Sequence, residues 1–245
     1  MKERKVLCVI PARYASTRLP GKPLLSIAGK PMIEHTYRRA ELAKFVGEVV
    51  IATDDERIFT AVKQFGGKVV MTRIDHASGT DRLAEVAEKY SDADVIINVQ
   101  GDEPLIDPTI IDRLVRVMLD DPMLEMATVK TTLHENEYNI PSAVKVVTDE
   151  DGYALYFSRS LIPYPRNKGE FIAYKHIGIY AYKRDFLLKF SKLPQGALEK
   201  TESLEQLRAL ESGSRIKVLT VDSVAIGVDT EEDLLQVRKL LENNG

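Results

Sequence analysis

Short β-branched runs alternate with segments of helical periodicity through the first half of the chain. Runs typical of strands occur at residues 5–10, 47–54, 68–71 and 94–100. Segments with helical periodicity follow them, at residues 31–45, 55–66, 79–90 and 108–122. This alternation predicts an α/β fold with a mostly parallel sheet and helices on both faces. In such sheets ligands bind outside the carboxyl ends of the strands, so a functional site is expected in the loops that follow the runs.

The second half of the chain has a different pattern. Residues 143–159 predict a β-hairpin with a glycine-containing turn, and residues 174–184 alternate like a strand of an exposed or lobe-forming sheet. Residues 198–213 predict one helix and residues 215–221 a strand, and an amphipathic helix with Thr230 and Asp233 at its N-terminal cap follows at 230–242. We therefore expect a single unit over residues 1–245, with a smaller inserted β-rich lobe at about 130–212.

The charge and cysteine content argue against several classes of protein. The 34 basic and 37 acidic residues give a net charge of −3, which argues against general nucleic-acid binding because that needs a basic excess. The single cysteine, Cys8, lies in the first apolar run and cannot form an internal disulfide, so we expect a buried thiol in the reducing cytoplasm. No window approaches the roughly 20 apolar residues of a membrane span, so we expect no membrane insertion.

Three cations lie in the loop that follows the first predicted strand. Arg13, Arg18 and Lys22 are interspersed with prolines at positions 11, 20 and 23, which stiffen the loop and lower the entropy lost on binding a ligand. A nucleoside triphosphate carries about four negative charges, and Arg and Lys are the usual counter-groups. The chain has no Gly-x-Gly sequence and no P-loop, so neither glycine motif binds the phosphates here. A solvated surface loop is the alternative, and we favour a triphosphate site.

Two acidic residues follow apolar runs that are far apart in the chain. Asp102 lies in QGDEP, directly after a predicted strand, and Asp229 lies in VAIGVDT. Each could cap a turn or a helix, and for Asp102 alone the turn is the better interpretation. Together with a cationic phosphate loop, two such carboxylates also fit Mg²⁺, which proteins usually bind through one or two carboxylates and substrate phosphates.

The segment HASGTDR, residues 76–82, precedes a predicted helix. Ser78, Gly79 and Thr80 would place backbone and hydroxyl donors at the helix N-terminus, where an anion or the edge of a nucleotide base can bind. Ser78 or Thr80 could also serve as a simple N-cap, and the two roles are compatible.

These segments together resemble the 3-deoxy-manno-octulosonate cytidylyltransferases, or CMP-Kdo synthetases, over about residues 5–240. The resemblance rests on PARYASTRLPGKPL, HASGTDR, NVQGDEP, AVKVV with ALYFSRSLIPYPR, YKHIGIYAY, LEQLRALE and GVDTEEDL. Two segments depart from the family pattern, NIPSAVKVV and PYPR, and neither contains a triphosphate or metal position. The resemblance implies a Rossmann-like nucleotidyltransferase sheet flanked by helices, with the β-rich lobe inserted.

The resemblance also implies a reaction. CTP and 3-deoxy-D-manno-octulosonate (Kdo) would give CMP-Kdo and pyrophosphate, with Mg²⁺ as cofactor, for lipopolysaccharide biosynthesis. The protein would be a cytoplasmic homodimer whose lobe serves sugar binding and dimerisation. A related sugar-acid enzyme, such as a CMP-sialic acid synthetase, is the alternative within this class, and YASTRLPGKPL with SGTDR favours Kdo. A non-catalytic nucleotide-binding regulator is the alternative of another class, which the presence of both strand-end acids disfavours.

Roles follow from the resemblance residue by residue. The catalytic residues would be Arg13, Lys22, Asp102 and Asp229, and the metal ligands Asp102 and Asp229. The nucleotide would contact Arg13, Arg18, Lys22, Ala52, Thr53, Arg73, Ser78, Gly79, Thr80, Arg82 and Gln100. The sugar would contact Gln100, Arg159, His176, Tyr180, Glu205 and Gln206. Without the resemblance, His176, Tyr180 and Glu205 have ordinary structural or solvated interpretations, whereas Arg159 ends an apolar strand and favours an anion.

Overall fold

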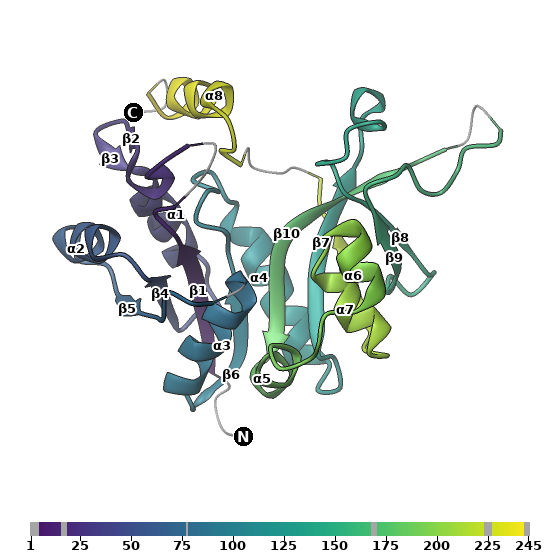
Figure 1. The fold of residues 1–245 in the computed structure, drawn as a ribbon, viewed down its shortest axis with the longest axis horizontal. Coiled ribbons are helices and arrows are strands. Elements are labelled where there is room, and N and C mark those ends of the chain that lie inside the picture. The colour runs from purple at the N-terminus through teal and green to yellow at the C-terminus, as the bar shows by residue number, and fades with distance from the viewer. Residues whose placement is uncertain (1–4, 16–18, 77, 168–170, 223–226, 243–245) are drawn as a thin grey trace.

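A central sheet runs through the whole molecule (Figure 1). The structure is a computed structural model that describes residues 5–15, 19–76, 78–167, 171–222 and 227–242. In order along the chain, the main strands are β1 (Lys5–Ala12), β4 (Glu48–Thr53), β5 (Val69–Met71), β6 (Ala93–Asn98), β7 (Met126–Thr132), β10 (Tyr174–Lys183) and β11 (Ile216–Thr220). Their order across the sheet is β11-β7-β10-β6-β1-β4-β5. All of these pairings are parallel except those of β10, so the predicted mostly parallel sheet is confirmed.

Helices cover both faces of the sheet, as predicted. One face packs against α1 (Met32–Glu41), α2 (Glu56–Gln64) and α4 (Pro108–Asp120). The other packs against α3 (Gly79–Lys89), α5 (Arg184–Phe190) and α7 (Gln206–Glu211). Strand β1 shows why both cores form: Cys8 and Ile10 enter the first and Leu7 and Val9 the second, because successive side chains of a strand point to opposite faces.

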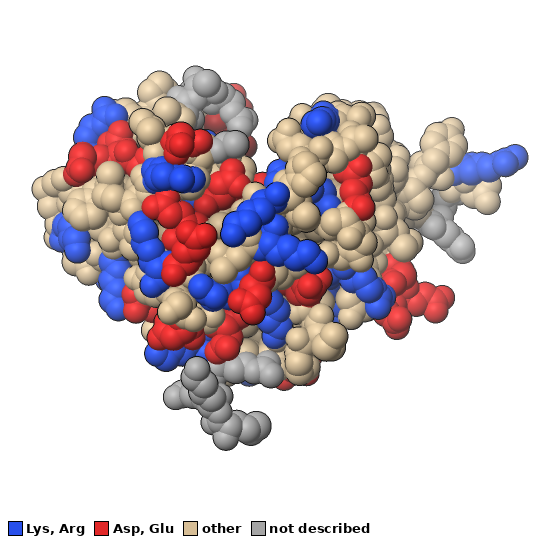
Figure 2. Space-filling model, turned by 60° about the horizontal axis from the view of Figure 1, so that its bottom comes forward, with Lys and Arg blue, Asp and Glu red and all other residues tan. Residues whose placement is uncertain are grey.

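The smaller lobe is built on a hairpin. Strands β8 (Lys145–Thr148) and β9 (Ala154–Ser158) pair antiparallel, which confirms the predicted hairpin, and β8 joins β10 at Lys145 and Lys175. The expected lobe range, residues 130–212, also contains the short helices η2 (Glu135–Glu137) and α6 (Ala197–Glu202). Figure 2 shows the molecular surface indented between two lobes, with acidic and basic side chains along the indentation.

Two sequence-based expectations need correction. The sequence predicts β10 in an exposed or lobe-forming sheet, and β10 does pair with β8 of the lobe, but most of it lies inside the central sheet between β6 and β7 and runs antiparallel to both. The single helix expected over 198–213 is two helices, α6 and α7, because Ser203 adopts a left-handed backbone conformation with φ of 51°. A left-handed residue cannot continue a right-handed helix. The sequence pattern did not predict strand β7 or helix α5 as separate elements.

The C-terminal helix packs beside the segment that follows the loop of residues 13–22, which we call the cation loop. After that loop come η1 (Lys22–Leu24), β2 (Ser26–Ile27) and β3 (Lys30–Pro31), and Ile27 shares a core cluster with Leu234 and Val237 of α8 (Glu231–Glu242). The predicted cap of α8 is confirmed: the Thr230 amide donates to the Asp233 carboxylate at 2.8 Å, and the Asp233 amide donates to the Thr230 hydroxyl at 3.2 Å. None of the described helices combines the length and apolarity needed to cross a bilayer.

Candidate active site

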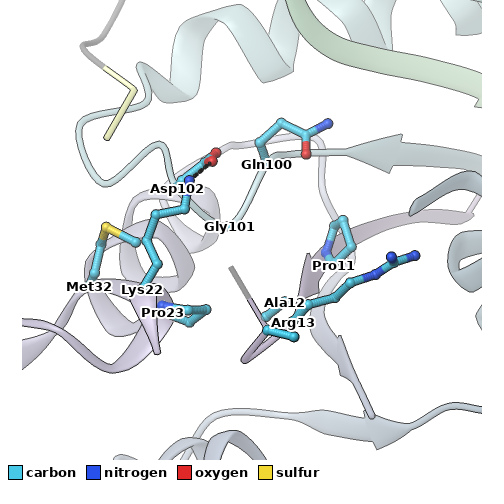
Figure 3. A pocket seen from close by; sticks show the side chains of 10 residues that line it. Pro11, Ala12, Arg13, Lys22, Pro23, Met32, Gln100, Gly101 and Asp102 are labelled. Carbon is cyan, nitrogen blue, oxygen red and sulfur yellow. Dashed lines mark hydrogen bonds and ion pairs between the residues drawn. The ribbon is translucent and has the colours of Figure 1, made fainter. Parts of the chain in front are cut away.

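A cavity of about 320 Å³ lies at the carboxyl ends of β1 and β6. The chain passes from β1 to β4 on one side, whereas β6 pairs with β1 on the other, so the sheet has a topological switch point here. The residues that line the cavity are Pro11, Ala12, Arg13, Ala15, Lys22, Pro23, Met32, Gln100, Gly101 and Asp102. Figure 3 shows Lys22 and Asp102 joined on one side of the cavity and the guanidinium of Arg13 on another.

The cation loop returns to the end of β1 through a tight turn. The Gly21 amide donates to the Tyr14 carbonyl at 3.1 Å, and Gly21 has a φ of 68°, a conformation that favours glycine. The Tyr14 ring packs against Gly21 on one side, and the Arg57 guanidinium lies 3.3 Å from the centre of the same ring. Lys22 then begins the short helix η1, so its backbone position is fixed.

Asp102 and Asp229 meet, although more than half the chain separates them. The Val228 amide donates to the Asp102 carbonyl at 2.9 Å and brings Asp229 beside the QGDEP turn. The Lys22 ammonium lies 2.5 Å from an Asp102 carboxylate oxygen and 3.2 Å from one of Asp229. One nitrogen, Nζ of Lys22, is in contact with both carboxylates. The two carboxylates are therefore close enough to share a cation. The sequence predicts that Lys22 contacts the triphosphate. In this structure its ammonium contacts Asp102 and Asp229.

The carboxylate pair fits a divalent cation. A cationic group, the Lys22 ammonium, lies between the carboxylates, and the Asp102 and Asp229 side chains are 32% and 51% exposed, so solvent can reach both. No group of three or more His, Cys, Asp or Glu side chains suited to a metal occurs among the described residues. The chain would therefore supply two carboxylates, and water or phosphate the remaining ligands, which is the usual manner of Mg²⁺ binding.

On the expected nucleotide side, only some of the predicted residues are accessible. The Arg13 guanidinium is exposed and donates to the His76 carbonyl at 3.3 Å. Ser78 caps α3 in a capping box with Asp81, which confirms its N-cap interpretation, and Gly79 begins the helix. Arg73 is exposed and lies 3.4 Å from Asp75.

Other predicted nucleotide contacts are buried. Ala52 and Thr53, at the end of β4, are fully buried. Arg82 is also fully buried, where it lies 2.9 Å from the Asp54 carboxylate and donates to the Thr72 hydroxyl. In this structure the Arg82 guanidinium therefore holds α3 against the loop after β4. Arg18 lies outside the described residues.

His76 is tied to α3 through Glu85. A ring nitrogen of His76 lies 2.6 Å from the Glu85 carboxylate. Burial raises the pKa of Glu85, but donors from the Arg73 amide, Lys89 and His76 outweigh this and lower its pKa to about 2. The negative charge of Glu85 thus fixes the segment whose carbonyl Arg13 contacts.

Three of the predicted sugar contacts come from neighbouring elements. The Gln100 amide donates to the Gly178 carbonyl of β10 at 3.1 Å, at a bulge between Ile177 and Tyr180. His176 packs edge-on against Phe157 and at a tilt against Tyr180. Gln100, His176 and Tyr180 therefore come together around β10.

His176 and Tyr180 lie in a low-dielectric region. Burial lowers the pKa of His176 to about 3, so its ring is neutral at neutral pH, and a ring nitrogen lies 3.0 Å from the Thr128 hydroxyl. Burial, with a smaller contribution from the Glu205 charge, raises the pKa of Tyr180. Both rings can offer neutral hydrogen-bonding groups to a ligand.

Glu205 links the lobe to the start of α3. The Thr80 hydroxyl donates to its carboxylate at 2.5 Å, and the other carboxylate oxygen is buried without a hydrogen-bond partner among the described residues. Burial raises the pKa of Glu205, which the Thr80 hydrogen bond opposes. Gln206, the next residue, is buried. The second Glu205 oxygen lies 3.6 Å from the Arg208 guanidinium, so an ion pair rather than a hydrogen bond compensates its charge.

Arg159 has a structural environment. Its guanidinium donates to the carbonyls of Glu202 at 2.6 Å, Pro141 at 3.0 Å and Ser203 at 3.2 Å. These bonds hold the break between α6 and α7. Its predicted role at the sugar stays a prediction.

Sequence reasoning missed two charged side chains near the site. Arg208 forms a buried two-pronged pair with Glu199, at 2.6 and 2.7 Å, and its guanidinium lies 3.6 Å from Glu205. Glu103, next to Asp102, is half-buried with one carboxylate oxygen enclosed, and desolvation together with the Asp102 charge raises its pKa to about 8. In the sequence, Arg208 could have been linked to the site through its position three residues after Glu205, a spacing that brings two helix side chains together. Glu103 could have been noticed through its position in QGDEP.

A family model and several known proteins match most of this chain. The model of the cytidylyltransferase family matches residues 7–216. The 3-deoxy-manno-octulosonate cytidylyltransferase of Geobacter sulfurreducens is 52% identical over 251 residues, which cover 97% of this chain and 99% of the relative. The protein of the same name from Solibacter usitatus is 53% identical over 241 residues, which cover 98% and 95%.

Solved structures agree with this. A CMP:2-keto-3-deoxy-manno-octonic acid synthetase, solved in complex with CTP, superposes with a TM-score of 0.95 at 52% identity and covers 98% of this chain and 100% of its own. A 4-diphosphocytidyl-2C-methyl-D-erythritol synthase from Anaerococcus prevotii superposes with a TM-score of 0.64 at 12% identity, covering 98% and 97%, and shows a shared fold.

Substitution Gly101→Ala tests the close approach between the QGDEP turn and β1. A Cβ at position 101 would lie 2.8 Å from the Pro11 carbonyl oxygen, a backbone atom that cannot rotate away. We expect the free energy of unfolding, measured with urea, to fall by about 1–3 kcal/mol. Gly178→Ala is the control, because its Cβ would meet only the Gln100 side chain, at 4.0 Å. Equal stability of Gly101→Ala and the parent protein would contradict the close approach.

Proposed function

The chain belongs to the cytidylyltransferase family, among the 3-deoxy-manno-octulosonate cytidylyltransferases, and from this premise we propose how its cavity carries out the reaction. The protein transfers CMP from CTP to Kdo and releases pyrophosphate. CMP-Kdo is the activated sugar for lipopolysaccharide biosynthesis. The observation that carries the assignment of the site is the meeting of Asp102, Asp229 and Lys22 at the ends of β1 and β6, on one cavity with Arg13.

The reaction needs no covalent intermediate on the protein. The anomeric hydroxyl oxygen of Kdo forms a bond to the α-phosphorus of CTP as the bond to the pyrophosphate oxygen breaks; the electron pair of that bond leaves with pyrophosphate, and the hydroxyl proton passes to solvent. Transfers of this type depend on positioning and on charge neutralisation, and the cavity offers cations rather than a nucleophile paired with a base. Arg13, exposed at the end of β1, is placed to bind the phosphates where charge develops.

Mg²⁺ is part of the proposal. Asp102 and Asp229 would hold it, because their carboxylates converge on one cationic group. When bound, the ion supplies neutralisation of phosphate charge and polarisation of the reacting oxygens. The chain's own contribution is to hold these two carboxylates together through the Val228 amide and the Asp102 carbonyl.

The substrates would lie on opposite sides of Gln100. The nucleotide side comprises Arg13, Arg18, Lys22, Ala52, Thr53, Arg73, Ser78, Gly79, Thr80 and Arg82. The sugar side comprises Arg159, His176, Tyr180, Glu205 and Gln206. The contact between Thr80 and Glu205 supports this arrangement, because it joins the start of α3 to the lobe.

We also propose that two copies associate through the lobe and that the enzyme is cytoplasmic. Large apolar side chains are exposed on segments of the lobe, with exposed fractions of 44% for Ile140, 62% for Leu155, 84% for Tyr164 and 63% for Ile172. Exposed apolar surface of this kind is typical of an association site. A free buried thiol at Cys8 is compatible with a reducing compartment.

A pyrophosphate-release assay tests the activity. Purified protein with Mg²⁺ is given CTP, UTP, ATP or GTP together with Kdo or a sialic acid. We expect release with CTP and Kdo, and rates at least about tenfold lower for every other pair. Release with a sialic acid at the Kdo rate would assign a different sugar. Binding of CTP without release in the presence of Kdo would indicate a nucleotide-binding regulator.

Substitution Asp102→Asn tests the proposed metal role. Loss of one carboxylate charge should lower kcat at saturating Mg²⁺ by more than about tenfold, a barrier change of about 1.4 kcal/mol. Asp94→Asn is a matched control, because Asp94 is at the start of β6, where its carboxylate accepts from the Lys5 amide at 2.9 Å. If kcat of Asp102→Asn stays within about tenfold of the parent value, the central role of this carboxylate is wrong.

The double substitution Tyr164→Glu, Ile172→Glu tests association through the lobe. Sedimentation should give about twice the chain mass of 27.5 kDa for the parent protein and the chain mass for the variant, because like charges oppose burial of these side chains in an interface. Met123→Glu is the control, since Met123 is 86% exposed but lies outside the lobe. A parent protein that sediments as a monomer would contradict the proposal.

A further inference from the structure

The Lys22 ammonium is held between the two carboxylates that are proposed to bind metal. It lies 2.5 Å from Asp102, 3.2 Å from Asp229 and 2.9 Å from the Val228 carbonyl, to which it donates. The Lys22 side chain is only 14% exposed, against 32% for Asp102 and 51% for Asp229. The positive charge is therefore the most enclosed member of the cluster.

The backbone around Lys22 fixes where its side chain begins. The left-handed Gly21 precedes it, Pro23 is buried after it, and the Leu25 amide donates to the Lys22 carbonyl at 3.2 Å. The side chain of Lys22 retains its rotatable bonds, however, so its ammonium can move while the turn stays in place. Lys22 also lines the same cavity as Arg13.

The ammonium and a divalent cation would bind the same two carboxylates. The Lys22 nitrogen contacts one oxygen of Asp102 and one of Asp229. A magnesium ion would need oxygens of these same two carboxylates at about 2.1 Å. Two cations a few ångströms apart repel one another, so the ammonium and the metal compete for one position.

We propose that Lys22 is an exchangeable counter-ion of the metal site. Its ammonium holds Asp102 and Asp229 together until a divalent cation takes their oxygens, and the displaced ammonium then turns into the cavity and pairs with a triphosphate. The inference rests on the proposed function, and it adds that metal and nucleotide binding assist one another through this one side chain. By reciprocity, each ligand raises the affinity for the other.

Magnesium titration without nucleotide tests the exchange. Lys22→Met keeps much of the length of the side chain and removes its charge, so Mg²⁺ no longer has to displace a cation. Calorimetry should give a Kd for Mg²⁺ at least about tenfold lower for Lys22→Met than for the parent. Lys30→Met is the matched control: Lys30 is exposed, it lies 3.9 Å from Glu34, and its removal should leave the Kd unchanged.

Equal or weaker Mg²⁺ binding by Lys22→Met overturns the exchange, because Lys22 would then only assemble the carboxylates. Absence of measurable binding by both proteins overturns it too. Neither result would affect pyrophosphate release from CTP and Kdo by the parent protein, so failure of the exchange is distinguishable from failure of the proposed function.

A measurement on the parent protein keeps the test independent of the variant's folding. Nitrogen-15 spectra of the lysine ammonium groups, with Lys22 assigned by loss of its signal in Lys22→Arg, should show the Lys22 resonance shifting during Mg²⁺ titration. The Lys30 resonance should not shift. A Lys22 resonance that is unmoved at saturating Mg²⁺ overturns the exchange.

Discussion

The hydrogen bond from the Val228 amide to the Asp102 carbonyl joins two segments between which the described residues form no strand pairing. It sets the C-terminal loop against the turn after β6 and thereby brings two carboxylates together at the edge of a cavity. Two negative charges at this separation repel one another, so the arrangement needs a cation. The Lys22 ammonium meets that need within the chain, and its position depends in turn on the tight turn at Gly21.

Much of the fold could be predicted because its first half obeys local rules. Apolar runs such as 5–10 and 94–100 become strands buried on both faces, and parallel neighbours place their following loops at one edge. Strand β10 shows the limit: its alternation identifies a strand but contains nothing about which strands flank it. The break at Ser203 escaped because serine has no special preference for a positive φ, and tertiary contacts from Arg159 hold that conformation.

The sequence predicted which residues belong to the site better than it predicted which side chains contact one another. The family resemblance placed Asp102 and Asp229 in one site, and the structure brings them together. It could not reveal that Arg82 would be buried against Asp54, since a helix pattern does not distinguish a cation that faces a ligand from one that faces a buried acid. Arg208 with Glu199 is a second such pair. Removing one partner of either pair would leave a buried charge without compensation.

Strand β10 carries a mechanical consequence. One end of it pairs with β6 beside the cavity, and the other pairs with β8 of the lobe, so a single ten-residue strand runs from one half of the molecule into the other. The two halves are therefore not joined by a flexible hinge. To move apart as rigid bodies they would have to break backbone hydrogen bonds of the central sheet. The lobe can move without breaking the central sheet where the β8–β9 hairpin twists or the short helices α6 and α7 shift, whereas Gln100 is bonded to β10 itself through the Gly178 carbonyl.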